Sequence, residues 1–204
     1  AFLVDHDPVH PAFGYRFDYK GRSVVFTGDT VKSENIARFG TVDMTKVVEA
    51  AAQAGCSRIV YTSTVGCIGL PKEEEGRVIP TDESTPVSEA QMSNHYKRSK
   101  WQAEVVAREL AAKGLPVVIV NPSAPVGPRD VKPTPTGQVI VDFLNRKMPA
   151  YLDTGLNWVH VRDVAVGHIL AAEKGRVGER YILGNAAGNW TMREAFAVLE
   201  EEIG

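Results

Sequence analysis

Tyr96 and Lys100 are the residues whose types and spacing most directly indicate chemistry. They stand four apart in a run that favours a helix, so one helical turn places the phenol and the ammonium on the same face. A tyrosine loses its proton near pH ~10, and a positive charge beside it favours the phenolate. The pair is therefore suited to general acid or base catalysis near neutral pH. Because the same spacing is also found on solvated helix faces, its meaning depends on the flanking segments.

The segments on either side of this pair repeat one pattern, in which a helix ends at a glycine and an apolar strand follows. The first unit spans residues 44–64 and the second spans residues 96–123, with Gly55 and Gly114 at the two helix ends. Two such units in succession are typical of a parallel α/β sheet. We therefore expect a partial Rossmann-like parallel sheet with flanking helices.

Both predicted strands end in polar residues. Thr62, Ser63 and Thr64 end the first strand, and Asn121-Pro122-Ser123 ends the second. Ligands of such sheets bind at the carboxyl ends of the strands. These residues are therefore expected to share one site with the helix that begins near residue 96.

Residues 1–39 show a different pattern, which predicts β structure. Residues 1–4 are apolar, residues 15–19 alternate in polarity, and residues 23–26 follow a turn at Gly21 as a second hairpin strand. We expect two domains, a β-hairpin segment over 1–39 and an α/β unit over 40–204.

The remainder of the chain continues the α/β alternation. Helices are predicted at 134–145 and at 163–174, the second capped by Asp163, and a short strand at 181–183. Thr191 and Glu194 have the spacing of a capping box at the start of the last helix. The stretch 66–90, rich in Pro, Glu and Thr, is predicted to be a surface loop.

The composition and charge of the chain exclude some classes of binding partner. The chain has 204 residues, of which 44% are hydrophobic, and a formal net charge of −2. This charge gives no basic field for nucleic acid, and no apolar run reaches the roughly 18 residues of a membrane span. Cys56 and Cys67 form no Cys-x-x-Cys pair, which favours buried thiols in a reducing compartment. We therefore expect a soluble cytoplasmic protein with neither nucleic acid nor a membrane as partner.

The strand ends and the Tyr96–Lys100 helix together carry a resemblance to a known family. From about residue 42 onward the chain resembles the extended short-chain dehydrogenases/reductases of the NAD-dependent epimerase/dehydratase group, most closely the hopanoid-associated sugar epimerases, near the dihydroflavonol reductases. The matching segments are residues 58–64, 96–100, 114–123, 126–130, 132–137, 148–157, 159–161 and 178–184.

The resemblance implies a role for each matching site residue. Tyr96 would transfer the proton of a sugar-like alcohol, Lys100 would lower its pKa and bind the nicotinamide ribose, and Thr64 would hydrogen-bond the substrate oxygen. The cofactor would be NAD or NADP, held at its nicotinamide end by Asn121, Pro122 and Ser123 and also contacted by Thr62 and Ser63. His160 and Arg129 match positions near the substrate, although a structural role fits each equally well.

The chain departs from this family at the phosphate-binding turn. Members begin with a Gly-x-x-Gly-x-x-Gly turn whose amides hold the pyrophosphate, and none of the 18 glycines forms that spacing. The cofactor site is therefore expected to be incomplete, and the choice between NAD and NADP stays open. A homodimer is a further expectation, because helices of this kind pair between subunits in the family.

Residues 1–39 resemble part of a second family, the metallo-β-lactamase-fold hydrolases of the arylsulfatase and ribonuclease Z type. The matching segments are residues 4–6, 11–16 and 21–30. In that family the positions of His6 and Asp29 are zinc ligands, but zinc takes three or four protein ligands and the His-x-His-x-Asp-His run is absent. We expect His6 and Asp29 to be loop residues without zinc.

The change of family and of periodicity at residues 39–42 suggests that the chain joins fragments of two genes. It starts inside a predicted strand and stops directly after a predicted helix, so both ends look cut. Three functions stay open: an epimerase or reductase acting on a sugar-like alcohol, a zinc hydrolase of phosphodiester or sulfate ester bonds, and a folded fragment without catalytic activity.

Overall fold

The computed structural model describes residues 2–4, 12–19, 22–26, 45, 48–74, 77–152 and 154–203. At the N-terminus, β1 (Phe2–Val4), β2 (Ala12–Tyr19) and β3 (Arg22–Phe26) form an antiparallel sheet in the order β1-β2-β3. The hairpin predicted from the alternation is confirmed, with Tyr19 opposite Arg22 across the turn. His6 and Asp29 lie outside the described residues.

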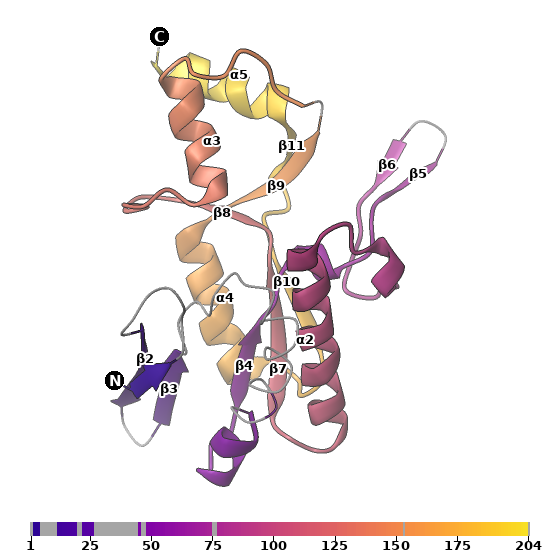
Figure 1. Cartoon of the computed structure of the whole chain (residues 1–204), viewed down its shortest axis with the longest axis vertical. Helices are drawn as coiled ribbons and strands as arrows, with labels where there is room; N and C mark the ends of the chain where they lie inside the picture. The colour runs from indigo at the N-terminus through magenta and orange to yellow at the C-terminus, as the bar shows by residue number, and fades with distance from the viewer. Residues whose placement is uncertain are drawn as a thin grey trace.

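A parallel sheet forms the centre of the molecule. It contains β4 (Ile59–Thr62), β7 (Val117–Pro122) and β10 (Arg180–Leu183) in the order β10-β7-β4. Helix α2 (His95–Ala112) covers one face and α4 (Val161–Lys174) covers the other (Figure 1). The predicted α/β fold, a partial Rossmann-like sheet preceded by a β-hairpin, is therefore confirmed.

Strand β7 is buried on both faces, which explains why its sequence is apolar without alternation. Val117 and Ile119 belong to the core cluster beneath α2, whereas Val118 and Val120 pack with Ala171 of α4. All four side chains are 0% exposed. Asn121 and Pro122, at the predicted polar end of this strand, pair with β10.

Glycines end the helices that precede β4 and β7, as predicted. Residues 48–53 are helical, and Gly55 and Gly114 adopt φ values of +76° and +93°. The amide of Leu115 donates to the carbonyl of Leu110, which closes the last turn of α2. Only glycine adopts such φ values without strain, so these two positions fix where each helix turns into its strand.

A second sheet lies beyond the carboxyl ends of the first. It comprises β8 (Ala124–Val126), β9 (Gly155–His160) and β11 (Asn189–Thr191), in the order β11-β9-β8. Helices α3 (Pro135–Leu144) and α5 (Met192–Ile203) accompany it, and Phe143 stacks on Phe196 with ring centroids 4.1 Å apart. The predicted capping box is present, since Glu194 accepts hydrogen bonds from both the amide and the hydroxyl of Thr191.

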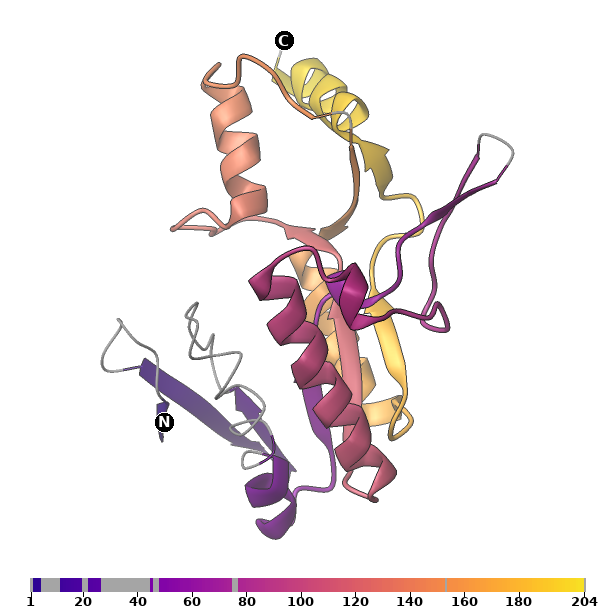
Figure 2. The same cartoon turned by 45° about the vertical axis from the view of Figure 1, so that its right-hand side comes forward.

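The structure corrects two local predictions. Helix α4 begins at Val161 rather than at Asp163, because the His160 ring caps it by accepting a hydrogen bond from the Arg162 amide (3.1 Å). The predicted surface loop contains β5 (Lys72–Glu74) and β6 (Arg77–Ile79), a hairpin that projects from the body of the molecule (Figure 2). Two short 3-10 helices lie on either side of this hairpin, η1 (Val65–Cys67) and η2 (Glu89–Gln91).

Within the described residues, no helix combines the length and the apolar character that a membrane crossing requires.

Replacing Ile119 by alanine tests the importance of the doubly covered strand. We expect the free energy of unfolding to fall by roughly 2–5 kcal/mol, because the change removes apolar contacts and leaves a cavity. Urea denaturation followed by circular dichroism measures this loss. Val131→Ala is the control, since this side chain is 93% exposed and its removal should change stability by less than about 0.5 kcal/mol. Equal effects of the two substitutions would contradict the assignment of β7 as the core strand.

Candidate active site

The alternation of side chains along the strands decides which residues face α2. Tyr61 of β4 and Ile119 of β7 pack into the cluster beneath α2. Because side chains two apart point to the same side, Ser63 and Asn121 also face this helix. Arg180 is paired in register with Ile119 and shares this face. Three polar side chains from three elements therefore point toward one helix.

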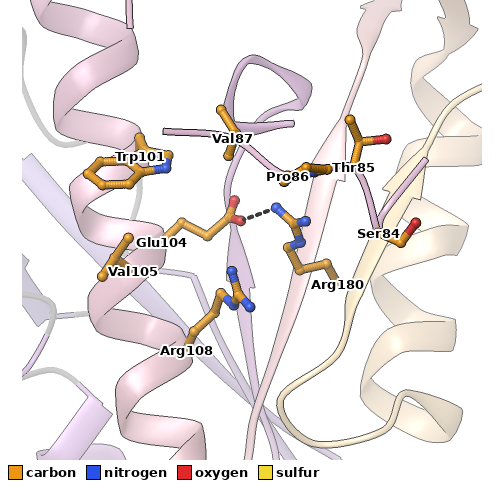
Figure 3. Close-up of a pocket in the computed structure, with 9 residues that line it drawn as sticks. All are labelled: Ser84, Thr85, Pro86, Val87, Trp101, Glu104, Val105, Arg108 and Arg180. Atoms are coloured by element: carbon orange, nitrogen blue, oxygen red, sulfur yellow. Dashed lines mark hydrogen bonds and ion pairs between the residues drawn. The ribbon is translucent and has the colours of Figure 1, made fainter. Parts of the chain in front are cut away.

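The three polar side chains meet at Glu104 of α2. Glu104 Oε2 accepts hydrogen bonds from Ser63 Oγ (2.5 Å) and Asn121 Nδ2 (2.7 Å), and Oε1 accepts from Arg180 Nη1 (3.1 Å). The side chain is 3% exposed and forms an ion pair with Arg180 (Figure 3). Sequence reasoning missed Glu104, although a charged residue among the apolar inner positions Ala103 and Ala107 was a signal of a buried role.

Tyr96 and Lys100 lie on the same helix, eight and four residues before Glu104. Asn94 caps this end of α2 by accepting a hydrogen bond from the Lys97 amide (2.8 Å). The Tyr96 side chain is 54% exposed and Lys100 is half-buried. The phenol therefore borders solvent at the carboxyl edge of the sheet, where a substrate can reach it.

Thr64 is joined to this helix through Asn121. Asn121 Nδ2 donates to the carbonyl of Thr64 (3.0 Å) as well as to Glu104. The Thr64 hydroxyl accepts a hydrogen bond from the Gly66 amide (3.2 Å) and caps η1, a segment that contacts α2. The structure thus brings Ser63, Thr64 and Asn121 together with the helix that carries Tyr96 and Lys100.

Cys67, at the end of η1, is part of the packing rather than a nucleophile. Its side chain is 0% exposed, and burial raises the pKa of the thiol to about 11. Because the thiolate is the reactive form, this cysteine stays inert near neutral pH.

The structure separates Thr62 from the other predicted site residues. Thr62 faces α4, and its Oγ1 lies 2.9 Å from His168 Nε2. His168 Nδ1 donates to the Val164 carbonyl (2.8 Å), so the ring is held from both of its nitrogens. The Thr62 hydroxyl therefore contacts His168 on the face of the sheet opposite Tyr96.

Ser123 lies where the chain passes from the first sheet into the second. Its Oγ donates to Asn157 Oδ1 (3.0 Å), and its amide donates to the Leu183 carbonyl (3.1 Å). Asn157 Nδ2 donates to the Asn185 carbonyl and to Asn189 Oδ1, each at 2.7 Å. The Ser123 hydroxyl therefore joins the two sheets, and Pro122 precedes it as the last residue of β7.

The strand ends fit the nicotinamide end of a dinucleotide better than its phosphates. Asn121 Oδ1 is a buried acceptor without a hydrogen-bond partner in the described structure. Such an atom suits a donor such as the carboxamide NH2 of nicotinamide. The Tyr96 hydroxyl and the Lys100 ammonium are donors for ribose hydroxyls. The chain offers no glycine-rich turn for the pyrophosphate, so the fit covers one half of the cofactor.

A pocket of about 320 Å³ lies beside α2, away from the predicted catalytic residues. Residues 84–87 line one side, Trp101, Val105 and Arg108 of α2 line the other, and the Glu104–Arg180 ion pair lies between them (Figure 3). Tyr96, Lys100 and Thr64 do not line this pocket. We therefore place the candidate site at the carboxyl edge of the sheet and not in this pocket.

The part of the chain that the structure describes holds no group of three or more His, Cys, Asp or Glu side chains able to bind a metal ion. His6 and Asp29, the two residues that match zinc-ligand positions of the hydrolase family, lie outside that part.

Comparison with known proteins assigns the chain to a family. The model of the NAD dependent epimerase/dehydratase family matches residues 29–184. The "Putative dihydroflavonol 4-reductase" of Synechocystis sp. is 41% identical over 180 residues, which cover 86% of this chain and 48% of that protein. The chain thus spans about half the length of this curated relative.

Two solved structures support the same assignment. The crystal structure of gox2253 matches with a TM-score of 0.76 and 44% sequence identity. The matched region covers 90% of this chain and 52% of the gox2253 chain. The structure of PA4631, a nucleoside-diphosphate-sugar epimerase from Pseudomonas aeruginosa, matches with a TM-score of 0.70 and 31% sequence identity. The matched region covers 82% of this chain and 54% of the PA4631 chain.

The comparisons give no support for the metallo-β-lactamase resemblance of residues 1–39 or for a chimeric origin. The epimerase/dehydratase model begins at residue 29, so it includes Asp29 and part of the segment that was expected to belong to a hydrolase. The fold and the convergence of Ser63, Thr64 and Asn121 on the Tyr96–Lys100 helix agree with these matches. The chain therefore belongs to the NAD-dependent epimerase/dehydratase family.

Proposed function

We propose that this chain carries the acid–base and nicotinamide-binding residues of an NAD(P)-dependent epimerase/dehydratase or reductase site that acts on a sugar-like alcohol. The observation that supports it best is the Asn121 bridge, which connects the Thr64 segment to the helix that bears Tyr96 and Lys100. The Thr64 hydroxyl, which follows β4, and the phenol and ammonium of α2 are thereby held at one edge of the sheet.

Tyr96 is the proton donor and acceptor in this proposal. It lies at the N-terminal end of α2, where the helix dipole favours a negative charge, and Lys100 one turn further on also favours the phenolate. Thr64 donates a hydrogen bond to the substrate oxygen and holds it near the phenol. In oxidation the alcohol proton passes to Tyr96, and in reduction the phenol returns it.

A bound dinucleotide would accept a hydride from, or donate one to, the substrate carbon that carries this oxygen. Lys100 and the Tyr96 hydroxyl bind the nicotinamide ribose, and Asn121, Pro122 and Ser123 border the nicotinamide. Ser63 acts through Glu104, whereas Thr62 faces α4 and takes no part in this proposed site. Either NAD or NADP is compatible with these residues.

The substrate class is proposed from the relatives. PA4631 is a nucleoside-diphosphate-sugar epimerase, and the Synechocystis relative carries the name of a reductase. An alcohol and its carbonyl form are the chemistry common to these two names, and PA4631 supports a sugar-like alcohol in particular, as in the hopanoid-associated sugar epimerases. We also propose an epimerase/reductase domain over residues 40–204, a homodimer and a cytoplasmic location.

Ligand-observed NMR with NAD+ tests the proposed half-site. Saturation transfer from the protein should be stronger for the nicotinamide and adjacent ribose protons than for the adenine protons, because the residues present contact only that end. Lys100→Ala should remove most of the signal, since it deletes the cation that holds the ribose. The method detects the millimolar affinities expected of a half-site, about −4 kcal/mol.

Lys113→Ala is the matched control, because Lys113 follows the opposite end of the same helix and is exposed. It should leave the saturation pattern unchanged. Equal saturation of adenine and nicotinamide, or a signal that survives Lys100→Ala, would overturn the assignment.

Metal analysis of protein purified without chelator tests the hydrolase alternative. We expect less than stoichiometric zinc, because only two residues, His6 and Asp29, match zinc-ligand positions and a zinc ion takes three or four protein ligands. One zinc ion per chain, lost on His6→Ala, would restore the hydrolase hypothesis.

A further inference from the structure

We propose that Glu104 is a positioning residue, whose carboxylate sets the location of Tyr96 relative to Thr64. The proposal rests on the proposed function, in which these two residues act on the same substrate oxygen. Glu104 itself is buried and lies outside the group of side chains that would touch substrate, so its effect must pass through its hydrogen-bond partners.

The Tyr96 phenol and the Thr64 hydroxyl come from elements that are not adjacent in the chain. Tyr96 is on α2 and Thr64 follows β4, and more than thirty residues, including the β5–β6 hairpin, separate them along the chain. Apolar packing beneath α2 is non-directional and tolerates a shift of the helix. Directional contacts are therefore needed to fix the distance between the phenol and the hydroxyl.

Glu104 supplies those contacts. Its Oε2 binds Ser63 Oγ, which immediately precedes Thr64, and also binds Asn121 Nδ2, which donates in turn to the Thr64 carbonyl. Both paths lead from one carboxylate oxygen to the Thr64 segment. Because Glu104 and Tyr96 belong to the same rigid helix, two turns apart, holding Glu104 also holds the Tyr96 end of α2.

Arg180 fixes the carboxylate from the other side. It pairs with Oε1, and it also donates to the Cys67 carbonyl (3.4 Å) and to the carbonyl of Glu83. The Glu83 carboxylate accepts from the Ile182 amide of β10 (2.8 Å). The guanidinium is thus itself held in place, and the carboxylate keeps one orientation.

A carboxylate matches the three partners at this position better than an amide does. Ser63 Oγ, Asn121 Nδ2 and Arg180 Nη1 are all donors, and an ionised carboxylate offers acceptors only. Glutamine has the same shape but carries one NH2 group, which must face either Arg180 or the Ser63–Asn121 pair. A donor would then oppose a donor in a buried site, and the network would have to shift to separate them.

Glu104→Gln therefore tests the proposal, with Glu109→Gln on the exposed side of the same helix as the matched control. The first measurement is the NMR shift of the Thr64 methyl and of the Tyr96 ring, assigned with Thr64→Val and Tyr96→Phe. The second is saturation transfer to NAD+. Both are made well below the melting temperature of each variant, so that every molecule is folded.

We expect Glu104→Gln to move the Thr64 and Tyr96 signals and to weaken nicotinamide binding by about tenfold, equivalent to about 1.4 kcal/mol. Glu109→Gln should change neither. Ser63→Ala, which keeps the Glu104–Arg180 pair, should move the same signals by less, and it replaces Glu104→Gln as the test if that variant does not fold.

A purely structural role for Glu104 predicts a lower melting temperature with unchanged Thr64 and Tyr96 signals, and that result would overturn the proposal. If the unsubstituted protein shows no saturation transfer to NAD+, the proposed function fails, but the shifts of Thr64 and Tyr96 still decide whether Glu104 positions them.

Discussion

The burial of β7 on both faces is the constraint on which the rest of the structure depends. A strand covered by α2 on one side and α4 on the other has no solvent face, so its side chains divide strictly between two apolar layers. A shift of one residue in register would exchange the two layers and place Asn121 against α4. The same packing that stabilises the sheet therefore also determines that Asn121 points toward the Tyr96 helix.

Much of this arrangement could be predicted from the sequence. The apolar run before Asn121 indicated a strand of a parallel sheet, and Gly114 indicated where α2 ends, because each pattern has a direct physical cause. The start of α4 was predicted wrongly because Asp163 is the usual type of capping residue, whereas the structure uses the ring of His160. The strand β9 was missed because its sequence, residues 155–160, mixes polar and apolar residues without regular alternation.

The positions of the candidate site residues could be predicted, but not their connections. Spacing indicated Tyr96 and Lys100, and the family resemblance indicated Thr64. Glu104 could not be connected to Ser63 and Arg180, because such a contact depends on the register of β4, β7 and β10. Thr62 and Ser63 are adjacent in sequence, yet they face opposite helices, a consequence of the two-residue period of the strand.

The junction between the two sheets differs in character from the contact beneath α2. Ser123, Asn157, Asn185 and Asn189 hold it through neutral hydroxyl, amide and backbone groups. None of these side chains changes charge between acid and alkaline solution, and neutral hydrogen bonds respond weakly to ionic strength. These contacts therefore depend little on salt and pH, and they persist under conditions that would weaken an ion pair such as Glu104–Arg180.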